Sequence, residues 1–230
     1  MSGATRRAVF ALTSHSQLGD TGNETGYYVP EAAHPWKVLT DNGFAVDFIS
    51  PAGGAPTPTG YDPQDEVQRE FLADRELAAK LAATRRPGDI APDDYDAILY
   101  VGGHGTMWDF PDDEDLAGVA RGIYETGGVV AAVCHGPAGL VNLKLSDGSY
   151  LLDGKDVAGF TNAEEEAVQL AEVVPFLLET KLKERGARHT GANNFAAHVV
   201  VSDRLVTGQN PASAAGVAEA IVDALATVPR

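Results

Sequence analysis

The chain has 230 residues, a formal net charge of −16 and a single cysteine. Its length fits one large α/β domain over residues 1–230, and its 44% hydrophobic content is ordinary for a protein with a sizeable core. The negative charge argues against nucleic acid or a membrane as a partner. One cysteine cannot form an internal disulfide, which is typical of a reducing compartment such as the cytoplasm.

Strands and helices alternate along the first part of the chain. Short apolar runs predict strands at 8–13, 44–49, 95–101 and 129–133. Apolar residues at helical spacing predict helices at 27–42, 66–84 and 112–126. Residues 51–63 are rich in proline and glycine and predict an irregular loop.

The second part of the chain combines hairpin and helix signals. We expect one hairpin of residues 150–152 and 156–160 around Asp153-Gly154, and another of residues 197–201 and 205–207. Helices are expected at 163–170, 175–185 and 210–226. The alternation predicts a three-layer α/β/α sandwich with a mainly parallel sheet.

The strongest functional signal is Cys134, directly after the apolar run 129–133. Gly136-Pro137 follows, so the segment reads as strand, sharp turn and helix. Such a turn projects its residue into the crevice at the carboxyl end of the strand, where a helix N-terminus stabilises a thiolate. We therefore expect Cys134 to be a nucleophile with a depressed pKa. The alternative is a buried cysteine that serves only packing.

Glu31 lies in a mostly apolar segment at the start of a predicted helix. It is either a solvated helix carboxylate or a buried acid that faces the crevice. In the second case, burial would raise its pKa and suit it to carry protons.

Two further stretches follow predicted strands. Residues 102–106, GGHGT, can bring backbone N–H groups close to an oxyanion, or can form a plain tight turn. Residues 159–166, GFTNAEEE, offer Glu164, Glu165 and Glu166, one of which can orient His135 as the acid of a Cys-His pair. The alternative is an acidic helix N-terminus.

No metal site and no cofactor are expected. The histidines are scattered at positions 15, 34, 104, 135, 189 and 198, without the spacing of paired metal ligands.

Together, the segments AAVCHGPAGL, VGGHGTMWDFP, YYVPEAAHPW, GFTNAEEEAV and LVTGQNPASA resemble the PfpI-like branch of the class I glutamine-amidotransferase-like superfamily. The similarity extends from the first strand to the last helix and is greatest to the heat-shock-chaperone subfamily, the glutathione-independent glyoxalase III proteins. It implies a flavodoxin-like sandwich, often a homodimer.

Position by position, the resemblance implies that Cys134 is the nucleophile, with His135 beside it and Glu31 as the buried glutamate that contacts the cysteine. Glu165 matches the acidic third member, with a register uncertain by one residue. The backbone amides of Gly103 and His135 match the oxyanion site.

The implied reaction is the conversion of methylglyoxal to lactate, formally a D-lactate dehydratase and thus a lyase, with glyoxal as a related substrate. The thiolate of Cys134 adds to the aldehyde, Glu31 or His135 moves a proton between the two carbons through an enediol, and hydrolysis releases lactate.

The sequence departs from true glutamine amidotransferases in one place. Those enzymes carry His-Pro-Glu near the C-terminal strand, whereas this chain has Gln209-Asn210-Pro211, which lacks the base for glutaminase chemistry. Three other functions remain open: removal of early glycation adducts, a holding chaperone, and a peroxide sensor in which Cys134 is oxidised.

Overall fold

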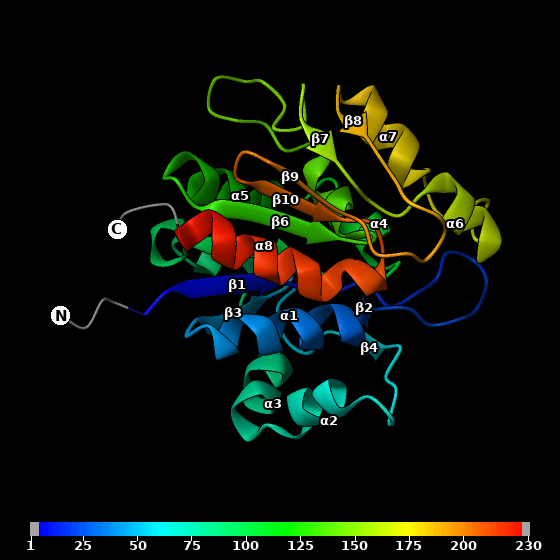
Figure 1. The fold of residues 1–230 in the computed structure, drawn as a ribbon. Helices are drawn as coiled ribbons and strands as arrows, with labels where there is room; N and C mark the ends of the chain where they lie inside the picture. Colours follow the sequence, from blue (N-terminus) through cyan, green and yellow to red (C-terminus); the bar gives the residue numbers. More distant parts are fainter. Residues whose placement is uncertain (1–4, 227–230) are drawn as a thin grey trace.

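The structure is a computed structural model that describes residues 5–226, and within them a six-stranded sheet forms the centre of the molecule (Figure 1). Neighbouring strands are parallel except for the last pair, which is antiparallel. In spatial order the strands are β3 (Ala45–Ile49), β1 (Arg7–Ala11), β5 (Ala97–Tyr100), β6 (Val129–Val133), β10 (Leu205–Gly208) and β9 (Val199–Ser202). This order is that of a flavodoxin-like sheet with one added antiparallel edge strand, so the predicted fold class is confirmed.

Helices cover both faces of the sheet. The helices are α1 (Val29–Asp41), α2 (Glu66–Ala73), α3 (Arg75–Ala82), α4 (Thr106–Asp109), α5 (Glu114–Glu125), α6 (Asn162–Ala167), α7 (Leu178–Glu184) and α8 (Ala214–Ala226). Short 3₁₀-helices are η1 (Pro87–Asp89), η2 (Pro92–Asp94), η3 (Gly136–Leu140) and η4 (Pro211–Ser213). Figure 1 shows α1 and α8 side by side on one face and α5 on the other.

Continuous apolar sequence in the central strands follows from this layering. Every residue of β5 and β6 is buried, because helices cover these strands on both sides. Their carboxyl ends meet at one edge of the sheet, which is where the next residues of the chain, Gly102–Gly103 and Cys134, are placed.

Three predicted elements differ from the structure. The helix expected at 66–84 is interrupted at Asp74, whose carboxylate accepts N–H bonds from Glu76 and Leu77 and so begins α3. The prediction of a hairpin around Asp153-Gly154 is wrong, because β7 (Asp156–Val157) pairs in parallel with the distant β8 (Arg188–His189). The helix expected after Cys134 is only the 3₁₀-helix η3.

The hairpin predicted at 197–207 is confirmed as the antiparallel pair β9 and β10. A further small parallel pair joins β2 (Tyr27–Tyr28) to β4 (Pro58–Thr59), and holds the segment that leads into α1.

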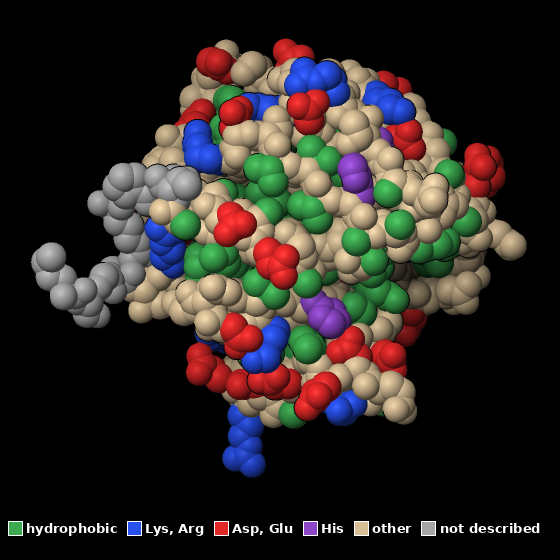
Figure 2. Space-filling model, viewed as in Figure 1, with side chains coloured by type: hydrophobic (Ala, Val, Ile, Leu, Met, Phe, Trp, Pro, Cys, Tyr) green, Lys and Arg blue, Asp and Glu red, His purple; other side chains and the backbone are tan. Residues whose placement is uncertain are grey.

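The surface mixes charges of both signs. Figure 2 shows acidic and basic side chains interspersed on the face that carries α8, with apolar side chains between them. No helix among residues 5–226 is long and apolar enough to cross a membrane.

Candidate active site

A cavity of about 230 Å³ lies at the carboxyl ends of β5 and β6. It brings together the predicted residues Glu31, Gly103, Cys134 and His135, with Glu165 directly behind them. The full lining consists of Tyr28, Glu31, Gly103, His104, Cys134, His135, Phe160, Val168, Phe195 and Pro211. Most of these side chains are apolar, so a small organic ligand fits the cavity better than a highly charged one.

The backbone at Cys134 adopts a conformation that few side chains tolerate. Its φ is +60°, a region that costs a non-glycine residue roughly 1–3 kcal/mol. Two hydrogen bonds of 2.9 Å fix it, one from its N–H to the Gly208 carbonyl and one from the Phe160 N–H to its own carbonyl. The neighbouring strand and loop thus hold the thiol in the cavity.

Glu31 reaches Cys134 because residue 102 is glycine. A Cβ at Gly102 would lie 2.2 Å from Glu31 Oε2 and 2.9 Å from Cys134 Cβ, so no other residue fits between them. The Glu31 side chain is fully buried in the first turn of α1. Neither of its oxygens makes a well-directed hydrogen bond to another group of residues 5–226.

Burial controls the protonation of this pair. It raises the pKa of Glu31 to about 8, although the Cys134 thiol and the Gly102 N–H act in the opposite direction. Burial also raises the pKa of the Cys134 thiol well above its ordinary value, and the Glu31 carboxylate raises it further. Both groups are therefore protonated at neutral pH.

The expectation of a depressed pKa for Cys134 is wrong for two physical reasons. The thiol is almost fully buried, and the segment after it is the five-residue 3₁₀-helix η3 rather than an α-helix. Without a long helix, few aligned peptide dipoles are available to stabilise a thiolate. The His135 backbone N–H lowers the pKa of the thiol, but burial outweighs it.

His135 links the thiol to Glu165. Its Nδ1 lies 3.3 Å from Cys134 Sγ, and its Nε2 lies 2.7 Å from Glu165 Oε2. Burial lowers the pKa of His135 to about 4, and the nearby His104 acts in the same direction. The imidazole is therefore neutral at physiological pH.

The carboxylate of Glu165 fixes which nitrogen of His135 carries the hydrogen. Burial acts to raise the pKa of Glu165, but hydrogen bonds with His104 and His135 outweigh it and lower this pKa to about 2. An ionised carboxylate only accepts, so the Nε2–H of His135 donates to it. This leaves Nδ1 with a free lone pair, directed at the thiol of Cys134.

Two backbone amides match the expected oxyanion site. Within residues 5–226, the N–H of Gly103 donates to no protein group, and the N–H of His135 contacts only the Cys134 sulfur. Gly103 has a φ of +108°, and a Cβ there would lie 2.2 Å from the Gly26 carbonyl. Glycine at this position is therefore required for the close approach of the two segments.

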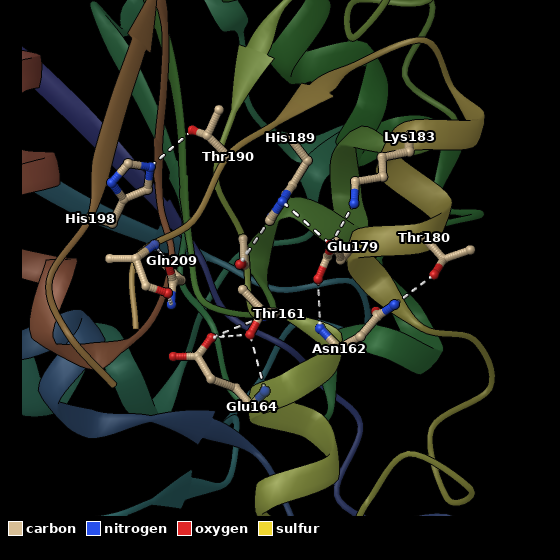
Figure 3. A network of polar contacts seen from close by, with 12 residues as sticks. Thr161, Asn162, Glu164, Glu179, Thr180, Lys183, His189, Thr190, His198 and Gln209 are labelled. Atoms are coloured by element: carbon tan, nitrogen blue, oxygen red, sulfur yellow. Dashed lines mark hydrogen bonds and ion pairs between the residues drawn. The ribbon is translucent and has the colours of Figure 1, made fainter. Parts of the chain in front are cut away.

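The three candidate glutamates have different surroundings. Glu165 faces the two histidines, Glu164 is also buried, and Glu166 is exposed. Glu164 and Thr161 form a reciprocal capping box at the start of α6. In Figure 3, the backbone N–H of Asn162 donates to Glu179 of α7 at 2.8 Å, and the side-chain amide of Asn162 points to Thr180.

Glu164 also anchors the loop of residues 190–197, which borders the cavity. Its Oε1 accepts the Phe195 N–H at 2.7 Å and the Asn210 amide at 2.9 Å. Gln209 accepts the N–H of Ala192 at 2.8 Å. Asn210 also donates to the Ala196 carbonyl at 2.8 Å. Gln209 and Asn210, which stand where amidotransferases carry His-Pro-Glu, therefore both hold this loop.

The ligand atoms of His104, His135 and Glu165 lie within 4.8 Å of one another, close enough to share a metal ion. Both oxygens of Glu165 already accept hydrogen bonds from the two histidines, at 2.9 Å and 2.7 Å. A cation would have to displace those bonds, so the arrangement fits a carboxylate shared by two imidazoles better than a metal centre.

Six residues of the cavity lining were not predicted as site residues from the sequence: Tyr28, His104, Phe160, Val168, Phe195 and Pro211. The GGHGT pattern indicates a glycine turn, but the position of His104 after β5, the strand next to β6, is a signal for a site residue. Phe195, with a φ of +62° and half of its surface exposed, lies in a loop that carries no motif.

Comparisons with known proteins show the family of the chain. The family model described as the DJ-1/PfpI family matches residues 25–224. The chain is 34% identical to the glutathione-independent glyoxalase HSP31 of Saccharomyces cerevisiae, over 96% of this chain and 99% of that protein.

Two solved structures have a similar fold. The fold is similar to that of the Rapid Encystment Protein 24 kDa of Francisella tularensis, with a TM-score of 0.92 and 36% identity over 96% of this chain and 99% of that one. It is also similar to glyoxalase III of Candida albicans, with a TM-score of 0.88 and 30% identity over 95% and 97% of the two chains.

Proposed function

This chain belongs to the DJ-1/PfpI family, and we propose that it is a glutathione-independent glyoxalase that converts methylglyoxal to lactate. The observation that carries the proposal is the position of Cys134. Its sulfur is held at a strained turn beside the lone pair of His135 Nδ1 and the buried acid Glu31. A thiol with two neighbouring groups that can accept or donate a proton is suited to add to the carbonyl carbon of an aldehyde.

The first step forms a hemithioacetal on Cys134. The thiol proton passes to His135 Nδ1 as the sulfur attacks the aldehyde carbon, and Glu165 stabilises the resulting imidazolium. The aldehyde oxygen takes up the negative charge beside the N–H groups of Gly103 and His135, and then receives the proton. No net charge is added to the buried site.

The remaining steps move hydrogen within the substrate. A base removes the proton from C1 of the hemithioacetal, which gives an enediol, and a proton returns to C2. The product is a thioester of lactate with Cys134, and water cleaves it to release lactate and the free thiol. The sum is methylglyoxal plus one water, so the reaction needs no external oxidant or thiol.

Several finer properties belong to the same proposal. The reaction class is a lyase, D-lactate dehydratase, and the substrates are small 2-oxoaldehydes such as methylglyoxal and glyoxal. Family resemblance supports a homodimer and one domain over residues 1–230. The single cysteine supports a reducing, cytoplasmic location.

The test is lactate formation from methylglyoxal with glutathione withheld. The wild-type protein is expected to form lactate, and Cys134→Ala is expected to form none. A wild-type protein without activity, or equal activity in Cys134→Ala, would overturn the proposal. Suppression of aggregation that persists in both proteins would instead favour a holding chaperone.

A further inference from the structure

The two histidines that share Glu165 differ in their access to a substrate. The His135 side chain is 1% exposed, and both of its ring nitrogens are engaged, one by the Cys134 sulfur and one by Glu165. The His104 side chain is 22% exposed and lines the cavity. Their rings lie 4.0 Å apart between centroids, so His104 stands directly beside His135.

The hydrogen bond of His104 fixes its tautomer. Its Nε2 lies 2.9 Å from Glu165 Oε1, and an ionised carboxylate can only accept that hydrogen. The hydrogen therefore resides on Nε2, and Nδ1 carries a lone pair. Within residues 5–226, no group of the protein is hydrogen-bonded to this Nδ1.

We propose that His104 is a catalytic residue, the base that takes the proton from C1 of the hemithioacetal and returns it to C2. This inference rests on the proposed function and deepens it. The resemblance assigns the transfer to Glu31 or His135, but the His135 side chain is only 1% exposed and its Nδ1 faces the Cys134 sulfur, whereas the His104 side chain is 22% exposed.

The step balances within the site. Nδ1 of His104 accepts the C1 proton, and the electron pair of the C–H bond becomes the C1–C2 double bond of the enediol. The π electrons of the C2 carbonyl move to its oxygen, which takes the proton of the C1 hydroxyl. The C1 oxygen then becomes the thioester carbonyl as C2 takes the proton back from Nδ1. His104 ends the step neutral, and no other reactant is consumed.

One carboxylate can support both histidines because they are charged at different times. His135 carries a proton while the thiol adds to the aldehyde, and gives it up when the hemithioacetal hydroxyl forms. Only afterwards does His104 become positive. A positive charge on His104 disfavours one on His135, which is the direction of their electrostatic coupling.

Solvent exchange distinguishes His104 from Glu31 in the unaltered protein. Glu31 is fully buried, so a proton that it carries returns to the substrate, whereas a proton on the partly exposed His104 exchanges with water. Reaction of methylglyoxal in D₂O is therefore expected to give lactate with more than half of C2 deuterated. Lactate without deuterium at C2 would overturn the proposal.

The matching variant is His104→Gln, whose amide can still donate to Glu165 but cannot carry a proton. We expect lactate formation to fall by about 100-fold or more, the range for loss of acid–base assistance. Methylglyoxal should still protect Cys134 of this variant from iodoacetamide, because hemithioacetal formation does not need His104. Lactate formation within threefold of wild type would contradict the assignment.

The control is His34→Gln, which places the same change at the histidine that is bonded to the Asp65 carboxylate, 2.8 Å away. This variant is expected to keep wild-type activity. An inactive wild-type protein would refute the proposed function itself. An active wild type with an active His104→Gln would refute only the role of His104.

Discussion

The carboxyl group of Glu31 and the thiol of Cys134 lie close together beside the Cα of Gly102, and both are buried. Burial raises the pKa of each, so the site holds a neutral acid next to a neutral thiol at physiological pH. The nucleophile must therefore be generated during the reaction rather than stored as a thiolate.

The reactivity of Cys134 should depend on the charge of residue 31. In the wild type, the pH midpoint of iodoacetamide alkylation is expected above 9, because burial and the Glu31 carboxylate both raise the pKa of the thiol. Glu31→Gln removes that carboxylate, so the midpoint should move to lower pH. An unchanged or higher midpoint in Glu31→Gln would show that the two groups do not interact.

Glu31 should also make folding stability pH-dependent. Its pKa is 4.5 in a free side chain and about 8 in the fold. Between these values the unfolded chain releases a proton that the folded protein keeps, so the carboxyl lowers stability as pH rises. Relative to the wild type, Glu31→Gln should gain up to about 1.4 kcal/mol of unfolding free energy per pH unit across this window. Denaturant unfolding at pH 5, 6, 7 and 8 measures the difference in unfolding free energy between the two proteins. A difference that does not change with pH contradicts the prediction.

The three consecutive glutamates should behave differently when each is changed to glutamine. Glu165→Gln removes the charge that stabilises His135 as a cation, so kcat should fall ten-fold or more. Glu164→Gln leaves the capping box and the Phe195 N–H imperfectly paired, which should cost about 1–3 kcal/mol of stability and raise KM more than it lowers kcat.

Glu166→Gln is the control for that series, because Glu166 is exposed. Activity and thermal stability of this variant should match the wild type. Equal and small effects at all three positions would mean that His135 has no carboxylate partner, which would leave Cys134 and Glu31 as a dyad.

Phe195 should influence substrate choice more than stability. Its ring lines the cavity 6.4 Å from that of Phe160, so its loss should reduce kcat/KM for phenylglyoxal more than for glyoxal. Phe195→Ala and Phe195→Gly both remove the ring, but only glycine relieves the strain of a φ of +62°. Phe195→Gly should therefore be the more stable by about 1 kcal/mol. Equal selectivity in wild type and both variants would remove Phe195 from the binding site.

Where local sequence dictates structure, the sequence was a reliable guide. The apolar run of β6 can only be a strand covered on both faces, and a cysteine followed by Gly136-Pro137 must leave the sheet at a sharp turn. The layered α/β fold and the position of Cys134 follow from these two facts.

Properties that depend on distant contacts could not be predicted in this way. The pKa of Cys134 depends on the burial of the thiol and on Glu31, which is distant in the sequence, and the direction of its shift was predicted wrongly. The parallel pairing of β7 with β8 joins segments about 30 residues apart, whereas the Asp153-Gly154 signal is local. Glu164 has a buried role only because Asn210, and Phe195 of the loop of residues 190–197, both bond to its carboxylate.

The shortness of α6 has a mechanical consequence. Within six residues it carries Glu164, which holds the loop bordering the cavity, and Glu165, which holds His135. A rotation of this single turn and a half would shift the rim of the cavity and the imidazole together. Substrate binding at the rim and proton transfer at His135 therefore both depend on α6, and a mutation that loosens this helix is expected to impair both.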